Sequence, residues 1–405
     1  MRNLKTTETF TSYQSKDYNG PAIKLGAGVL VGEAYEAAEA EGYRAVGGEC
    51  GSVGISGGYS QGGGHSILNS KHGMGTDQVL EWEVVTARGE HLIATPEQNT
   101  DLYWALSGGG GTYGVVLSMT TRLHKDGPFT GGSLGFTLED AGNNATAYWK
   151  AVSLWFQQLP SLTEDGRTLQ FIVFNNSFQA IAINLPDVDD SSAVQTLLAP
   201  YTAELDDLKI PYHVASTVFT SFLDYFNSTY GPLPYGPQPP DTILTSRLIP
   251  RSSVDGESVT PLVEAIQATV SDGTFLFGCS AMSLPDVSHP DNAVLPAWRD
   301  SIAICNVNAY WKYTEPLETN LNVKKILTEQ YQPLIEAATP GSGVYLNEID
   351  PWYKGDWKEA MYGVNYDRLL EIKHRNDPDY LLYGHFAVGG DEFTEDGDGR
   401  LCRVN

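Results

Sequence analysis

The order of apolar and polar residues predicts short strands and helices through the first third of the chain. Brief apolar runs and one half-buried alternating segment predict strands over 22–25, 28–31, 78–86, 91–94 and 113–120. Helices are predicted over 32–41, which is rich in alanine and glutamate, and over 99–106, with Asn99 or Thr100 as N-cap. This mixture indicates an α+β unit.

At the turn-forming sequence Lys125-Asp126-Gly127-Pro128 the pattern of predicted strands and helices changes, and we interpret this point as a domain boundary. Beyond it, strands alternate with longer helices. A hairpin is predicted over 168–174 and 179–184, and amphipathic helices over 259–270 and 317–338.

Two later segments differ from this middle region. The proline-rich stretch 231–240 is either a plain surface loop or part of a substrate entrance. From residue 343 the residue pattern changes again, and a strand over 344–348 and a helix over 365–375 are predicted.

Composition and charge narrow the classes of function. With 405 residues, 41% of them hydrophobic, the chain is long enough for two domains. Its net charge of −25 excludes the basic stripe of a nucleic-acid-binding protein and disfavours an anionic membrane surface. No apolar run reaches the roughly 20 residues that span a bilayer, and the first residues lack the apolar core of a secretory signal. Cys50, Cys279, Cys305 and Cys402 are too few and too dispersed for a disulfide framework or a zinc site.

The candidate chemistry lies in a glycine-rich run over residues 47–66, in which nine of the twenty residues are glycine and Cys50 is the single cysteine. Because glycine has no Cβ, such a run brings backbone N–H groups against a polar ligand. A second run follows at 107–114. Neither run has the Gly-Lys-Ser/Thr of a phosphate-binding loop or the setting of a Rossmann fingerprint. Two such approaches and one thiol suggest a large cofactor, covalently held.

The internal order of these runs resembles the berberine-bridge-enzyme-like branch of the vanillyl-alcohol-oxidase superfamily, in its fungal form. The first match is Gly-Gly-x-Cys-x-x-Val-Gly-x-x-Gly-Gly-x-x-x-Gly-Gly-Gly from Gly47 to Gly64, and the second runs from Asp101 to Val116. The third comprises Tyr345-Leu346-Asn347-Glu348-Ile349-Asp350 and a block from Tyr362 to Lys373. The resemblance covers nearly the whole chain.

This resemblance implies a fold and an activity. Residues 1–125 would form a PCMH-type FAD-binding domain that lacks its N-terminal part, and 126–342 a substrate-binding domain with an antiparallel sheet backed by helices. Residues 343–405 would return to the FAD domain. The implied activity is that of an FAD-dependent oxidoreductase in fungal secondary metabolism. It would transfer hydride from an alcohol, amine or activated C–H of a small molecule to the flavin, which O2 reoxidises.

The resemblance also assigns residues. Cys50 would form a thioether to the flavin, and Val53 matches the position that controls oxygen access. The flavin would further contact residues matching the family's glycine-rich and C-terminal motifs: Gly54, Gly57, Gly58, Gly62, Gly63, Gly64, His65, Gly110, Val116, Asn365 and Tyr366. We expect no metal ligand, and His65 and His72 are not assigned as such.

The proton acceptor is expected in the family's Tyr-x-Asn-Tyr-x-Asp motif. Here glutamate replaces the second tyrosine, so that Tyr345 and Glu348 are both candidates, and Trp311-Lys312-Tyr313 could supply a partner.

The chain begins at a position matching the middle of the family's flavin domain, so we expect it to lack the preceding histidine loop and the second covalent link. Two alternatives therefore stay open: a flavin-deficient, non-redox cyclase-like or ligand-binding protein, and an inactive shortened product. A longer form could be secreted, but the sequence does not settle the location.

Overall fold

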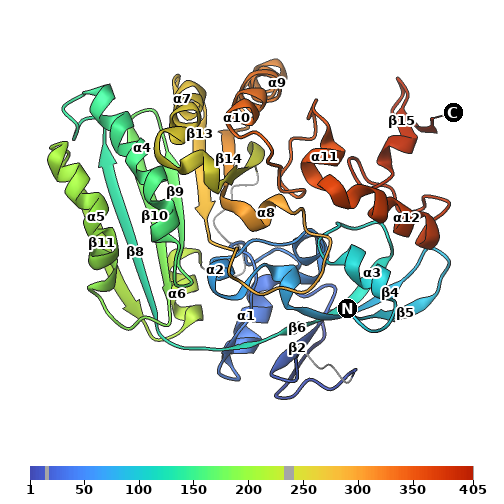
Figure 1. Ribbon diagram of the computed structural model, residues 1–405. Coiled ribbons are helices and arrows are strands. Elements are labelled where there is room, and N and C mark those ends of the chain that lie inside the picture. The colour runs from blue at the N-terminus through green and yellow to red at the C-terminus, as the bar shows by residue number, and fades with distance from the viewer. Residues whose placement is uncertain (14–17, 232–240, 405) are drawn as a thin grey trace.

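Two antiparallel sheets organise the protein. The computed structural model describes residues 1–13, 18–231 and 241–404 (Figure 1). The predicted proline-rich loop therefore lies, apart from Gly231, outside the described residues. The predicted α+β class is confirmed.

The first sheet has the order β1-β2-β6-β4-β5 and lies at the bottom of Figure 1. Its strands are β1 (Leu4–Thr7), β2 (Ala22–Gly26), β4 (Val79–Val85), β5 (His91–Ala94) and β6 (Val115–Arg122). Helices α1 (Val31–Glu39) and α3 (Thr100–Leu106) contribute to the core on this sheet. The predicted strands 22–25, 78–86, 91–94 and 113–120 are confirmed to within about two residues at either end.

The strand predicted over 28–31 is wrong. Leu30 forms only an isolated bridge with Gly54, and α1 begins at the next residue. The Glu33 carboxylate accepts a hydrogen bond from the Leu30 N–H at 2.9 Å, which caps the helix at this point. An early helix start thus replaces the predicted strand.

The second sheet has the order β11-β8-β10-β9-β13-β14-β12 and spans the left and centre of Figure 1. Its strands are β8 (Phe129–Thr137), β9 (Thr168–Val173), β10 (Ser177–Pro186), β11 (His213–Phe219), β12 (Thr242–Pro250), β13 (Leu276–Ala281) and β14 (Ser301–Tyr310). The predicted hairpin is β9–β10.

Long helices cover one face of this second sheet. They are α4 (Ala145–Leu162), α5 (Ala193–Asp207) and α7 (Val259–Val270). In α4, Tyr148, Val152, Trp155 and Leu159 recur at helical spacing and are buried. The Trp155 ring meets Phe171 of β9 and Phe178 of β10 edge-on, at 5.7 and 5.0 Å between centroids. This packing leaves the opposite face of the sheet for other contacts.

The predicted helix 317–338 forms with a widened turn in its middle. It consists of α9 (Leu317–Ile326), a π-helical turn (Leu327–Tyr331) and α10 (Gln332–Ala338). The Gln332 N–H donates to the Leu327 carbonyl, five residues back. Pro333, in the first turn of α10, has no N–H to donate to a regular ladder, which suits its position directly after the widened turn.

The C-terminal region returns to the first sheet. Helix α12 (Tyr366–Asn376) lies against α3, where the Arg368 guanidinium stacks on the Trp104 ring at 3.8 Å. The strand predicted over 344–348 is wrong, because this segment is an irregular turn. Its backbone donors go elsewhere: the Tyr345 N–H donates to the Ser246 hydroxyl and the Val344 N–H to the Ala360 carbonyl.

The remaining α-helices and strands are short. They are α2 (Asn69–His72), α6 (Phe222–Thr229), α8 (Ala297–Asp300), α11 (Trp357–Met361), β3 (Tyr43–Arg44), β7 (His124–Lys125), β15 (Phe393–Glu395) and β16 (Leu401–Arg403). In the part of the chain that the structure describes, no helix combines the length and apolar character needed to cross a bilayer.

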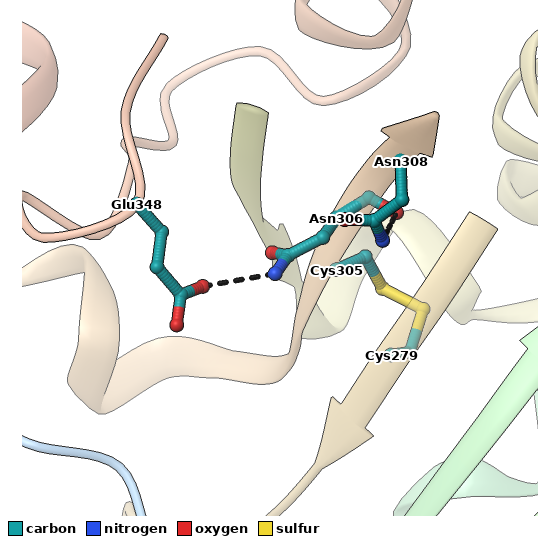
Figure 2. Close-up of a disulfide and its surroundings, with 5 residues drawn as sticks. All are labelled: Cys279, Cys305, Asn306, Asn308 and Glu348. Carbon is teal, nitrogen blue, oxygen red and sulfur yellow. Dashed lines mark hydrogen bonds between the residues drawn. A yellow bond between two sulfur atoms is a disulfide. The ribbon is translucent and has the colours of Figure 1, made fainter. Parts of the chain in front are cut away.

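A disulfide joins Cys279 and Cys305, which face each other on β13 and β14 (Figure 2). The number and spacing of the cysteines predicted no disulfide framework, and this single bridge was not predicted. The 26-residue separation gives no sign of pairing, since only the strand register brings the two residues opposite one another.

Candidate functional site

A cavity of about 770 Å³ lies between the glycine-rich run and the second sheet. Its walls come from that run, from β9, β10, β12, β13 and β14, and from the turn at 345–348. Eight predicted site residues line it: Cys50, Val53, Gly54, Gly57, Gly58, His65, Tyr345 and Glu348. The fold thus brings the predicted thiol and both predicted proton acceptors to one cavity.

The glycines of the run serve two different purposes. A Cβ added at Gly54 or Gly57 would meet no atom within 4 Å, so the space in front of these residues is open. A Cβ at Gly62 would lie 2.6 Å from the Asn347 amide nitrogen and 2.8 Å from the Gly58 carbonyl oxygen. Gly64, with φ +76°, would similarly press on the Tyr59 ring. The first pair borders the cavity, whereas the later glycines allow close packing within the protein.

This wall fits the flavin that the resemblance implies. A flat ring needs bare backbone to lie against, and the open space before Gly54 and Gly57 provides it. Cys50 and Val53 border the same cavity, and the Val53 side chain is 39% exposed. Cys50 belongs to no disulfide. The residues that would hold the ring are therefore those from Cys50 to Gly58.

Seven predicted cofactor contacts are not among the described residues that line this cavity: Gly62, Gly63, Gly64, Gly110, Val116, Asn365 and Tyr366. Two of them make hydrogen bonds to other parts of the protein. The Asn365 amide donates to the carbonyls of Ala293 and Val294 at 3.2 and 3.1 Å, and the Tyr366 hydroxyl donates to the Asp391 carboxylate at 2.8 Å.

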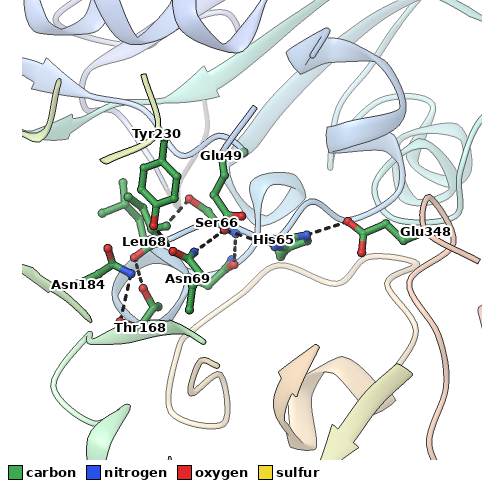
Figure 3. Close-up of polar contacts among 12 residues, drawn as sticks. Glu49, His65, Ser66, Leu68, Asn69, Thr168, Asn184, Tyr230 and Glu348 are labelled. Carbon is green, nitrogen blue, oxygen red and sulfur yellow. Dashed lines mark hydrogen bonds and ion pairs between the residues drawn. The ribbon is translucent and has the colours of Figure 1, made fainter. Parts of the chain in front are cut away.

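A partly buried ion pair dominates the polar side of the cavity. His65 Nε2 lies 3.2 Å from Glu348 Oε1, and the Asn306 amide donates to Glu348 Oε2 at 3.0 Å (Figures 2 and 3). Burial alone would lower the pKa of His65, but the hydrogen bond and charge of Glu348, with the charge of Glu49, raise it to about 9. Burial alone would raise the pKa of Glu348, but His65 and Asn306 hold it below its ordinary value. At neutral pH the pair is therefore charged.

Tyr345, the other candidate acceptor, is in a different state. Its side chain is buried, and burial raises the pKa of its phenol. Its oxygen accepts a hydrogen bond from the Asn347 amide at 2.6 Å, and its ring meets His65 edge-on. The phenol therefore keeps its proton at neutral pH, and of the two candidates only Glu348 is ionised.

The partner predicted at Trp311-Lys312-Tyr313 is not among the described residues that line the cavity. Strand β14 ends at Tyr310, which does line it. Asn306 and Asn308 precede Tyr310 at intervals of two along this strand and also border the cavity. The residues that alternate with them are buried in the core: Cys305, Val307 and Ala309. The alternation of polar and apolar residues is the sequence signal that could have found these amides.

Glu49 is a further cavity residue that sequence reasoning did not assign. Its Oε1 lies 3.9 Å from His65 Nδ1 and accepts a hydrogen bond from the Gln170 amide at 2.7 Å. The available signal was a single charged residue beside Cys50 within the glycine run. Among the described residues, no three His, Cys, Asp or Glu side chains are grouped so as to hold a metal ion.

Known proteins resemble this chain over nearly its whole length. A family model of FAD-binding domains matches residues 4–95, and a model described as berberine and berberine-like matches residues 344–386. The chain is 47% identical over 406 residues to the bifunctional decalin synthase calF of Penicillium decumbens, covering 99% of this chain and 70% of that protein. It is 44% identical over 407 residues to the VAO-type flavoprotein oxidase VAO615 of Thermothelomyces thermophilus, covering 100% of this chain and 70% of that protein.

A solved structure agrees with the sequence relationship. The crystal structure of the VAO-type flavoprotein MtVAO615 from Myceliophthora thermophila superimposes with a TM-score of 0.94 at 43% identity, over 100% of this chain and 73% of that one. Both the order of the motifs and the fold that carries them are therefore shared. The chain belongs to the fungal, berberine-bridge-enzyme-like family of VAO-type FAD-linked oxidoreductases, whose cofactor is FAD.

Proposed function

We propose that the protein oxidises a small molecule, an alcohol, an amine or an activated C–H, and that O2 is its electron acceptor. The observation that carries this proposal is the meeting of the Cys50–Gly58 wall with the ionised Glu348 carboxylate in one cavity. FAD, when bound, supplies the hydride-accepting chemistry. The protein's own residues bind and orient the substrate and take up its proton.

Glu348 is the proton acceptor in this proposal. Its carboxylate is ionised at neutral pH, and His65 and Asn306 fix its two oxygens in place. A hydroxyl proton of the substrate would pass to Glu348, and the adjacent His65 cation would hold the carboxylate in position. Tyr345 would shape the site through its ring and its neutral hydroxyl, since its raised pKa makes it a poor acceptor at this pH.

Cys50 is proposed to hold the flavin by a thioether. Its place among open glycines supports this role, and Val53, three residues later, would stand between the ring and dissolved oxygen. Gly62 and Gly64 would support this wall by letting Asn347 and Tyr59 pack closely against the run.

The experiment has three readings on one preparation. The purified protein should show flavin absorbance that stays with the protein after acid precipitation. In the Cys50→Ala variant, acid precipitation should leave the flavin in the supernatant. Anaerobic mixing with a panel of primary alcohols, amines and reducing sugars should bleach the flavin bands with at least one member. Admitting O2 should then restore the bands and yield H2O2. A bound flavin that no panel member reduces would count against the proposal.

A second function is favoured by one relative, because the name of calF describes a bifunctional decalin synthase. The apolar part of the cavity, with Ile172, Ile181 and Leu276, could fold and orient a linear apolar substrate for ring closure. A folded protein that retains no flavin would favour this cyclase-like or ligand-binding reading over the oxidase.

A further inference from the structure

His65 lies between two carboxyl groups of the cavity, and the proposed function gives a role to one of them only. Nε2 of the imidazole is 3.2 Å from Glu348 Oε1, and Nδ1, on the opposite side of the ring, is 3.9 Å from Glu49 Oε1 (Figure 3). Nδ1 is buried and has no hydrogen-bond partner among the described residues. The Nδ1 side of the imidazolium therefore faces Glu49 across a gap that is longer than a hydrogen bond.

The contacts of Glu49 fit an ionised carboxylate. Its Oε1, the oxygen that faces His65, also accepts a hydrogen bond from the Gln170 amide at 2.7 Å. The Tyr230 hydroxyl donates to the carbonyl oxygen of Gln170, and this leaves the amide nitrogen of Gln170 for Glu49. Two N–H donors thus converge on one oxygen. An ionised carboxylate suits this arrangement because it only accepts hydrogen bonds.

The imidazole is placed so that it can approach either carboxylate. The Trp298 ring lies nearly parallel to it, with 20° between the two planes, and the Tyr345 ring meets it edge-on at 5.4 Å between centroids. These two rings leave both nitrogens facing carboxylates. A movement of about 1 Å within the ring plane would bring Nδ1 within hydrogen-bonding distance of Glu49.

The charges of this cluster show why a second carboxylate matters. Among the described residues that line the cavity, the carboxyl and imidazole side chains are those of Glu49, His65 and Glu348. With all three ionised, the cluster carries one negative charge. When Glu348 takes up a proton the cluster becomes neutral, and Glu49 is then the anion beside the His65 cation. Without Glu49 the same step would leave that cation, whose side chain is only 16% exposed, without a counter-charge, which is unfavourable.

The pKa directions agree with this sequence of events. The charge of Glu49 helps to raise the pKa of His65. Burial raises the pKa of Glu49, His65 and Gln170 act to lower it, and the charge of Glu348 acts to raise it. Proton uptake by Glu348 removes the last of these effects and leaves the His65 cation in place. Glu49 therefore holds its negative charge more firmly at that moment.

The other titratable groups around the cluster add no opposing charge. They are the neighbouring Cys50 and the phenols of Tyr35, Tyr59, Tyr225, Tyr230 and Tyr345. Burial raises the pKa of each phenol, so all five keep their protons at neutral pH.

We propose that Glu49 is a positioning residue that holds the His65 cation while Glu348 takes up the substrate proton. In the resting cavity the imidazolium is hydrogen-bonded to Glu348. As the substrate O–H or N–H bond breaks and its proton passes to Glu348, the imidazolium moves to Glu49 and donates its Nδ1–H to Oε1. It keeps both of its protons, so no covalent bond of His65 or Glu49 is made or broken. This inference rests on the proposed function, because the role of Glu348 comes from it.

The hold on His65 can be measured without any substrate. Glu348→Gln imitates the state after proton uptake, because glutamine is neutral and of the same size. In protein labelled with ¹⁵N at histidine, the His65 ring signals are identified by their absence in His65→Gln and are followed against pH. We expect His65 to titrate at higher pH in Glu348→Gln than in the double variant Glu49→Gln/Glu348→Gln, since only the single variant keeps an anion beside the ring. Equal midpoints would overturn the proposal.

Two further variants serve as controls for this titration. Glu49→Asp/Glu348→Gln keeps a charge at position 49 and should titrate at higher pH than the glutamine double variant. If it does not, position 49 does not act through its charge, and the proposal fails. Glu83→Gln removes a carboxylate that is not among the described residues lining the cavity and should leave the His65 midpoint unchanged. Melting temperatures establish that each variant is folded.

The kinetic test distinguishes a positioning residue from one that binds the substrate. We expect Glu49→Gln to slow anaerobic flavin reduction by about tenfold or more and to leave KM within about twofold, with much of the rate restored in Glu49→Asp. Loss of the neighbouring anion makes Glu348 easier to ionise, so the rising limb of the pH profile should move to lower pH. A rise in KM at an unchanged rate would mean that Glu49 binds the substrate and would overturn the proposal.

The two experiments separate this inference from the proposed function. If no panel member reduces the flavin, the oxidase proposal fails, yet the NMR titration still decides whether Glu49 holds the His65 cation. If the flavin is reduced but His65 titrates at the same pH in Glu348→Gln and in the double variant, the oxidase stands and the inference fails.

Discussion

His65 Nε2 and Glu348 Oε1 lie 3.2 Å apart although 283 residues separate them in the sequence. His65 follows the last glycine of the run, and Glu348 lies in the turn that precedes α11. Their contact therefore joins the proposed flavin wall to the C-terminal segment. Both side chains are partly buried, 16% exposed for His65 and 24% for Glu348, so each charge stabilises the other and the pair sets the protonation of this side of the cavity.

Replacing Glu348 by glutamine should abolish most of the proposed reaction. The variant keeps the size of the side chain but cannot accept a proton, and loss of a general base commonly costs about 100-fold or more. We expect flavin reduction to slow by this factor in anaerobic stopped-flow measurements, and the pKa of His65, followed by NMR, to fall from about 9. An unchanged rate in a folded variant would exclude Glu348 as the acceptor.

The same pair should make stability depend on pH. The pKa of His65 is raised from 6.5 to about 9, so its contribution is fully present below pH 6.5 and is lost as the pH rises towards 9. Glu348, whose pKa is lowered, contributes above 4.5 and loses its contribution as the pH falls through its folded value. The stability difference between the parent and His65→Gln should therefore be largest between pH 4.5 and 6.5. The raised imidazole pKa sets an upper limit of about 3 kcal/mol.

Urea unfolding at a series of pH values checks this window. The control is His91→Gln, because His91 also pairs with a glutamate, Glu83, but is more than half exposed. An exposed pair contributes at most about 1 kcal/mol. A difference between parent and His65→Gln that does not change with pH would contradict the prediction.

The glycine wall and the fold class could be predicted from the sequence, because a run of glycines and alternating apolar segments are local signals. It did not contain the Glu49–His65–Glu348 cluster, which exists only because three separate segments fold to one place. Strands 28–31 and 344–348 were mispredicted for a related reason. Glu33 caps a helix early at the first, and Ser246 and Ala360 take the backbone groups of the second. The domain limits near residues 125 and 342 remain our proposal.

The disulfide between β13 and β14 of the second sheet should contribute to stability. Cys279 and Cys305 close a loop across 26 positions, for which about 2–4 kcal/mol is typical. The double variant Cys279→Ala/Cys305→Ala should unfold at lower urea concentration than the oxidised parent. Dithiothreitol should lower the midpoint of the parent and leave that of the variant unchanged. If the reductant has no effect on the parent, the bridge does not stabilise the fold.

Two glycines of the run should respond differently to the same substitution. At Gly54 the backbone is extended and an added Cβ meets nothing within 4 Å, so Gly54→Ala should leave the free energy of unfolding nearly unchanged and lower the flavin content. At Gly62 the added Cβ would press on the Gly58 carbonyl at 2.8 Å, so Gly62→Ala should cost about 1–3 kcal/mol. The ratio of flavin to protein absorbance and urea unfolding measure the two effects. Equal behaviour of the two variants would contradict the division of the wall.

Asn306 offers a way to move the proton acceptor without removing it. Its amide donates to Glu348 Oε2 at 3.0 Å, and Asn306→Asp replaces this donor by a second carboxylate. Two carboxylates at that distance resist joint ionisation, so the apparent pKa of Glu348 should rise. Since the proposed base acts only when ionised, the rising limb of the pH profile of flavin reduction should move to higher pH, with the plateau rate largely kept.

Asn308→Asp is the matched control for this shift. Asn308 borders the same cavity two residues along β14, but its amide donates to the Asn306 carbonyl at 3.2 Å and not to Glu348. A charge at this position should move the limb much less. Equal shifts in the two variants would indicate a general effect of cavity charge. No shift in either would mean that another group sets the limb, and Glu348 would lose its proposed role.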